Sequence, residues 1–128
     1  MRKFWFACVL TAVACAASIP ALAHHSTAMF DLTQQTTLVG RIKVFQWTNP
    51  HAWIQVTVPG PDGDVEWSIE CGSPNSLSRQ GWKATMFAAG DRVQIVASPM
   101  KDGTHAAMLI SVTLPDGRVF GPGAPAAR

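Results

Sequence analysis

Hydrophobic and polar residues alternate along much of the chain after residue 35, which is the pattern of β-strands that bury one face. The alternation is clearest where Ile54, Val56 and Val58 share one face, opposite one aromatic and two polar side chains. The pattern predicts five strands, at residues 36–47, 52–58, 65–71, 92–98 and 106–114, followed by a small terminal hairpin that turns at 115–117 and reaches Phe120.

Turn and capping residues separate these strands. The Pro-Gly-Pro-Asp-Gly-Asp run at 59–64 predicts a turn that joins the second and third strands as a hairpin. Ser73 suits a helix N-cap, and Pro74 suits the first helical position. Gly81 suits a left-handed stop, so we predict one short helix at residues 74–80.

Three strands, a short helix and two further strands are the element order of an OB-type fold. Gly40 lies inside the long first strand, where the missing side chain permits a sharp bend or a bulge. We therefore predict a mainly β domain at residues 24–120, a small five-stranded OB-like β-barrel with one short helix between strands 3 and 4. A β-sandwich-like roll is the alternative. Residues 121–128 are mostly Pro, Gly and Ala, and we expect a flexible tail there.

The first residues have the three parts of an export signal. A basic start is followed by an apolar run at 4–17 and by the small-x-small sequence Ala21-Leu22-Ala23. We predict a Sec-type signal peptide at residues 1–23, cleavage after Ala23 and a periplasmic location. The run is too short for a membrane anchor. Lipidation at Cys15 is disfavoured because the usual leucine is missing before it.

Cleavage would leave 128 − 23 = 105 residues, enough for one small domain. The net charge of +2 comes entirely from Arg2 and Lys3, because the remaining eight Lys and Arg balance eight Asp and Glu. This neutrality argues against nucleic acid as a partner. Cys71 would be the one cysteine left, so no intrachain disulfide could form. A buried small hydrophobe is its expected role, with metal ligation or intermolecular pairing as the alternatives.

Cleavage after Ala23 would place His24 at the amino terminus, directly before His25. The free α-amine and the imidazole of His24 could then chelate one metal ion, with His51 as a third nitrogen ligand. This arrangement resembles the histidine brace of copper proteins, and Cu(II) heads the divalent affinity order for such donors. His25 is the alternate ligand. The geometry requires residues 26–35 to fold back along the first strand.

The alternative for these histidines is a solvated terminus and a His51 that only forms a hydrogen bond in its turn. A second function class is a metal-independent envelope module for scaffolding or for binding a peptide, glycan or protein. Its candidate ligand face comprises Trp47, Trp53 and Asn49, although packing would also explain the tryptophans. Trp67 alternates with aliphatic residues and is predicted to lie in the core.

The sequence offers little for catalysis, and we expect that the protein is not an enzyme. No serine lies in a nucleophile-elbow context. Glu66 and Glu70 share one strand face, where solvent exposure explains both carboxylates. Met29, Met86, Met100 and Met108 could supply thioether ligands for Cu(I). Met86 and Met108 lie in apolar surroundings that favour packing, so Met29, five residues after His24, is the strongest candidate among them.

Several separated motifs resemble a family of small exported bacterial proteins, domain of unknown function 6152 (DUF6152). The resemblance includes the double histidine and the Asn-Pro-His block, and it implies no biochemical activity. Cys71 departs from the usual glycine, and His105 lies in a variable turn. The motifs are His24-His25-Ser26, Phe30-Asp31, Trp47-Thr48-Asn49-Pro50-His51, Gly72-Ser73-Pro74-Asn75, Gly81-Trp82 and residues 111–118.

Overall fold

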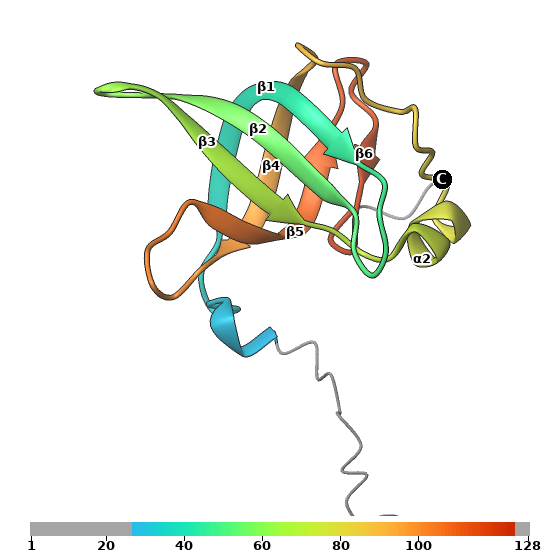
Figure 1. Cartoon of the computed structure of the whole chain (residues 1–128), viewed down its shortest axis with the longest axis horizontal. Helices are drawn as coiled ribbons and strands as arrows, with labels where there is room; N and C mark the ends of the chain where they lie inside the picture. Colours follow the sequence, from blue (N-terminus) through green and yellow to red (C-terminus); the bar gives the residue numbers. More distant parts are fainter. Residues whose placement is uncertain (1–26, 125–128) are drawn as a thin grey trace, which may run out of the picture.

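One β-sheet curls around on itself until its third and fifth strands meet (Figure 1). The computed structural model describes residues 27–124. Within them, the elements in chain order are η1 (Thr27–Met29), β1 (Thr36–Gln46), β2 (Trp53–Gly60), β3 (Gly63–Glu70), α2 (Pro74–Arg79), β4 (Arg92–Pro99), β5 (Ala106–Thr113) and β6 (Val119–Phe120).

The strand order is β3-β2-β1-β4-β5-β6, with antiparallel pairing between neighbours. A parallel pairing between β3 and β5 closes the barrel, and it spans only Ser68 to Glu70 on β3. The predicted five-stranded OB-like barrel, with one short helix between strands 3 and 4, is therefore confirmed. The short closure leaves β3 and β5 to separate directly after Glu70 and Met108.

β1 curves strongly because it pairs with strands on two sides of the barrel (Figure 1). Its first half pairs with β4 and its second half with β2, and a register shift lies between Ile42 and Val44. Gly40 permits a close approach of backbones, because a Cβ there would lie 2.3 Å from the Thr57 carbonyl oxygen. The expected irregularity thus lies two to four residues after the glycine.

The turn between β2 and β3 is shorter than the sequence suggested. Pro59 pairs with Asp64 and Gly60 with Gly63, so the ladder extends into the predicted turn and only residues 61–62 connect the strands. No β1 residue pairs with β2 beyond Thr57. Pro59, which has no N–H, therefore interrupts no ladder between β1 and β2.

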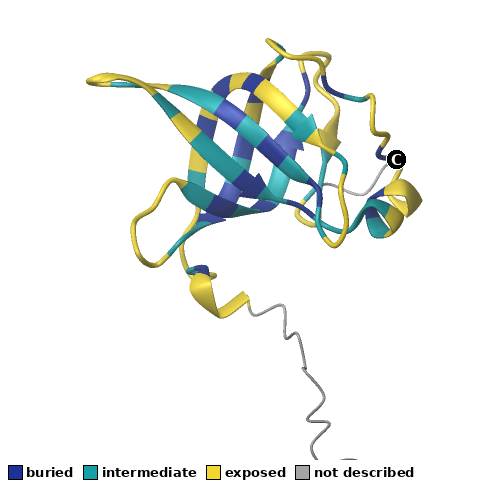
Figure 2. Cartoon of the chain, viewed as in Figure 1, coloured by how far each residue is buried: buried dark blue, intermediate teal, exposed yellow. Residues whose placement is uncertain are grey.

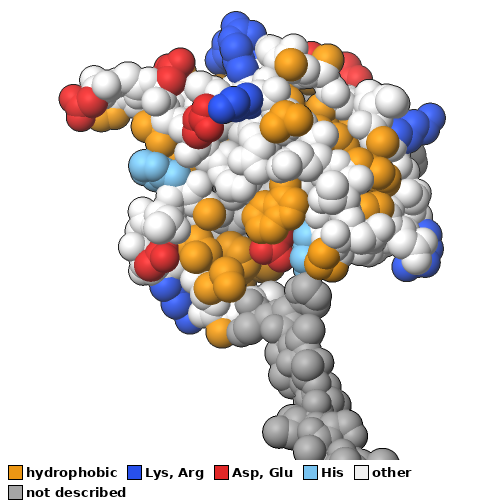
Figure 3. Space-filling model, viewed as in Figure 1, with side chains coloured by type: hydrophobic (Ala, Val, Ile, Leu, Met, Phe, Trp, Pro, Cys, Tyr) orange, Lys and Arg blue, Asp and Glu red, His pale blue; other side chains and the backbone are white. Residues whose placement is uncertain are grey.

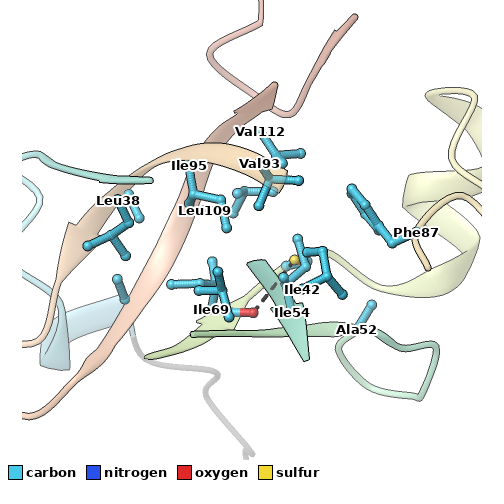
Figure 4. Packing of buried hydrophobic residues seen from close by; sticks show 14 of the residues in the cluster. Leu38, Ile42, Ala52, Ile54, Ile69, Phe87, Val93, Ile95, Leu109 and Val112 are labelled. Atoms are coloured by element: carbon cyan, nitrogen blue, oxygen red, sulfur yellow. Dashed lines mark hydrogen bonds between the residues drawn. The ribbon is translucent and has the colours of Figure 1, made fainter. Parts of the chain in front are cut away.

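Inward-facing aliphatic residues fill the barrel, and α2 lies beside one of its ends (Figures 2 and 4). The predicted helix signals are confirmed: the Ser73 hydroxyl accepts a hydrogen bond from the Ser76 N–H at 3.2 Å, and Gly81 has φ +85°. Leu77 faces the core and is 2% exposed. Trp67 is only half-buried, at the margin of the core.

The segments flanking the barrel both pack against it. Phe30 forms an isolated bridge with Met100, and the Asp31 N–H donates to the Pro99 carbonyl. We expected a flexible tail from residue 121. Instead, the Gly123 N–H donates to the Ile110 carbonyl at 2.8 Å, so residues 121–124 lie against β5. Residues 125–128 lie outside the described part, and among residues 27–124 no helix is long and apolar enough to cross a membrane.

Candidate functional site

A cleft of about 580 Å³ lies beside the last paired residues of β3 and β5. η1, the β1–β2 loop, the end of β3, α2, β5 and the C-terminal segment each contribute to its wall. Most wall residues are apolar, while His51 and Glu70 provide the ionisable polar groups, and no Lys or Arg is among the described lining residues. On the face shown in Figure 3, a histidine lies beside an acidic side chain with hydrophobic side chains around them.

The His51 ring is held in one orientation. Its Nδ1 lies 3.0 Å from the Cys71 carbonyl oxygen, and because a carbonyl can only accept, Nδ1 carries the proton and donates. Nε2 then lies 3.6 Å from Oε1 of Glu70. The two side chains are 24% and 20% exposed. A backbone bond at one ring nitrogen is the usual way in which proteins orient a histidine that binds metal through the other.

The hairpin register brings these two residues together. The Cys71 N–H donates to the Ala52 carbonyl and the Ala52 N–H donates to the Gly72 carbonyl, both at 2.9 Å, which extends the ladder beyond β2 and β3. His51 directly precedes this added pair. Glu70 is the cross-strand partner of Trp53. Neighbouring strands therefore place the loop histidine beside a carboxylate that is 19 positions later in the chain.

Three sulfur atoms belong to the same cleft, from Met29, Cys71 and Met108. Cys71 is buried, as predicted, and its burial raises the pKa of the thiol to about 12. At neutral pH it is a neutral thiol and a poor metal ligand, because cysteine ligates as the thiolate. The two thioethers need no deprotonation.

Two of the predicted metal ligands, His24 and His25, lie outside the described residues, as does the predicted signal peptide at 1–23. The first described residue, Thr27, lines the cleft together with His51. The condition derived from the sequence, that residues 26–35 fold back along the first strand, is not met in the part described, yet Thr27 still reaches the cleft. Residues 30–31 pair with the end of β4 and the residue after it, because Phe30 buries its ring there and is 4% exposed.

The predicted aromatic ligand face does not form one surface with the cleft. Trp47 contacts Phe45 with ring centroids 5.6 Å apart and packs against the core. Trp53 is half-buried on the outer side of β2, and Asn49 is exposed. None of these three residues is among the described residues that line the cleft.

Sequence reasoning missed Glu70 and Met108. Alternation correctly placed Glu70 on the outer face of β3, but that position is covered by the β1–β2 loop and is not a solvated face. One signal in the sequence could have indicated Glu70. The Asn-Pro-His block directly precedes β2, and because β2 and β3 pair as a hairpin, the residues before β2 lie beside the end of β3. Within residues 27–124 no group of three or more His, Cys, Asp or Glu is arranged to hold a metal ion.

Comparisons with known proteins identify a family and leave the activity open. A family model described as "Family of unknown function (DUF6152)" matches residues 12–109. A search of curated proteins found no match. Among solved structures, the mitochondrial single-stranded DNA binding protein Rim1 of S. cerevisiae is similar, with a TM-score of 0.47 and 16% identity over 64% of this chain and 94% of that chain.

Proposed function

The chain belongs to the family of unknown function DUF6152, and from its cleft we propose that it is an exported, non-enzymatic domain that binds copper or another transition metal. The observation that carries this proposal is the oriented His51 ring. Its Nε2 lies beside the Glu70 carboxylate in a cleft that Thr27 also lines. One imidazole and one carboxylate supply two metal ligands, and the cleft favours a cation because its described wall has no Lys or Arg.

The remaining ligands in this proposal come from the processed amino terminus. His24 lies three residues before Thr27, so the chain between them can span at most about 10 Å. Cleavage after Ala23 would give His24 a free α-amine, and the amine and imidazole together would add two nitrogen donors. With His51 they make three nitrogens, a set that favours Cu(II) over the earlier divalent metals. His25 is the alternate ligand.

The test compares three proteins whose amino termini are verified by intact mass: the native form starting at His24, a form extended by one alanine, and His51→Ala. We expect about one Cu(II) per native chain, with affinity about tenfold or more lower in the other two. The control is His105→Ala, because His105 is exposed and lies outside the cleft wall. Equal Cu(II) affinity in the native and extended forms would rule out the amino-terminal chelate.

A second candidate function is a metal-independent binding module for a glycan, peptide or protein of the cell envelope. The observation in its favour is on the outer face of β2, where the half-exposed Trp53 ring lies in the same row as Gln55, whose amide donates to Gln46 at 2.9 Å. An indole ring offers an apolar stacking face and side-chain amides offer hydrogen-bonding groups, a combination that suits a sugar or a peptide. Trp53→Ala would abolish that binding, whereas His51→Ala would leave it unchanged.

A further inference from the structure

We infer that the cleft binds a soft monovalent cation, Cu(I), through the thioethers of Met29 and Met108 together with His51. The inference deepens the proposed function and rests on its cleft. It uses only residues that line the described cleft, so it does not depend on the amino terminus.

Met108 lies next to Glu70 in the sheet. The two residues are partners in the parallel pairing of β3 with β5, so their side chains leave the sheet on the same face. The neighbours of Met108 in the strand, Ala107 and Leu109, are buried in the barrel, which places Met108 on the outer side. Because Glu70 lies beside His51, the Met108 thioether belongs to the same side of the cleft as the imidazole.

Met29 is an exposed hydrophobic residue on a fixed backbone. Its carbonyl accepts from the Lys101 N–H at 2.9 Å, and the next residue, Phe30, is 4% exposed. The Met29 side chain nevertheless remains 51% exposed at the cleft. Packing therefore explains Phe30 but does not explain Met29. A thioether held at the edge of a cleft has the access that a metal ligand needs.

The donor types select the metal. Thioethers are soft, neutral ligands that favour Cu(I), whereas Zn(II) and the harder divalent ions prefer nitrogen, oxygen and thiolate. Glu70 supplies one negative charge near the site, which suits a monovalent cation. The same cleft thus offers nitrogen donors for Cu(II) and sulfur donors for Cu(I), without any electron transfer being required of the protein.

Ag(I) is the probe, because it has the coordination preferences of Cu(I) and is not oxidised in air. The test protein carries the one-alanine extension, which removes the amino-terminal chelate, and its methionine methyl groups are labelled with carbon-13. We expect Ag(I) to shift the NMR signals of Met29 and Met108 and to leave those of Met86, which packs against the core, and Met100 unchanged.

The affinity test uses the double variant Met29→Leu, Met108→Leu, which keeps side-chain volume and removes sulfur. We expect Ag(I) affinity to fall about tenfold or more, whereas the matched control Met86→Leu, Met100→Leu retains it. Unchanged Ag(I) affinity in the first variant, with no methyl shifts at Met29 and Met108, would overturn the inference. If Cu(II) binding proves independent of the amino terminus while this loss of Ag(I) occurs, the proposed chelate fails and the thioether site stands.

Discussion

At the scale of single residues, burial decides which of the polar and sulfur groups can react. Cys71 and His51 are joined by a hydrogen bond, yet only the imidazole presents a metal-binding atom to the cleft at neutral pH. Burial keeps the Cys71 thiol protonated, since the charged thiolate would lose its hydration. Of these two residues on one wall of the cleft, only His51 can therefore bind a metal ion at neutral pH.

The Cys71 thiol should make stability depend on pH in the alkaline range. Burial raises its pKa from 9.0 to about 12, so between these values the unfolded chain loses a proton that the folded chain keeps. The free energy of unfolding should consequently fall as the pH rises from 9 toward 12. Urea titrations of the native protein and of Cys71→Ala measure this, and the variant should show the shallower decline. Equal declines would mean that the thiol ionises as readily in the fold as in the unfolded chain.

At the scale of elements, nearby residues determine where a helix begins, whereas the pairing of strands determines which distant residues become neighbours. α2 begins at Pro74 because the Ser73 hydroxyl accepts from the Ser76 N–H, and this bond is contained within four residues. Strand pairing instead joins residues that are distant in the sequence, and it can place unfavourable partners opposite each other. Arg41 and Arg92 are direct partners in the pairing of β1 with β4, although both are positively charged.

Removing the helix cap tests the local signal. Ser73→Ala should lower the free energy of unfolding by about 1 kcal/mol, because the Ser76 N–H loses its acceptor. Ser78→Ala is the matched control, since Ser78 is exposed in the same helix and alanine favours helix formation. Chemical denaturation of both variants provides the comparison. A cost in the control as large as in Ser73→Ala would contradict the capping role.

Removing one charge of the Arg41–Arg92 pair tests whether the two side chains repel each other across the strands. Among residues 27–124 neither Arg41 nor Arg92 forms an ion pair, so Arg92→Gln should raise stability by about 0.2–1 kcal/mol at low salt. The gain should shrink in 1 M salt, where the screening length is only about 3 Å. Arg118→Gln is the control with the opposite sign, because Arg118 lies 2.8 Å from Asp116. A gain from Arg92→Gln that is insensitive to salt would exclude charge repulsion as its cause.

At the scale of the whole molecule, the cleft brings together segments that are far apart in the chain. η1, the β1–β2 loop, the end of β3, α2 and β5 all meet around it. A bound cation at this position would hold these elements together. Its effect should therefore extend to global stability.

Metal binding should raise the unfolding temperature of the native form. A free Cu(II) concentration about 100-fold above Kd would add about 2.7 kcal/mol to the free energy of unfolding. Thermal unfolding followed by circular dichroism, with and without metal, measures the gain, and a chelator should reverse it. His51→Ala should show a much smaller gain. Identical gains in both proteins would place the metal elsewhere on the chain.

The strands, the helix and the buried faces could all be predicted from the order of the amino acids. Side-chain alternation and helix capping are local properties, so Ile54, Val56 and Ser73 carried the information needed for each element, and the element order indicated the OB-like barrel. The predicted length of the hairpin was less accurate. The sequence of Pro59 and Gly60 is typical of a turn, but both residues pair with β3, and Pro59 is tolerated there because no β1 residue pairs with it.

The position of the cleft and the residues that line it depend on how distant parts of the chain pack together. Glu70 read as a solvated carboxylate and Met108 as a packing residue, because alternation reports which face a side chain occupies but not what covers that face. Their meeting with His51 depends on the register of β2 with β3 and on the short closure of β3 against β5. The His51–Glu70 contact and the Glu70–Met108 pairing join residues 19 and 38 positions apart, and a local pattern contains no information about such distances.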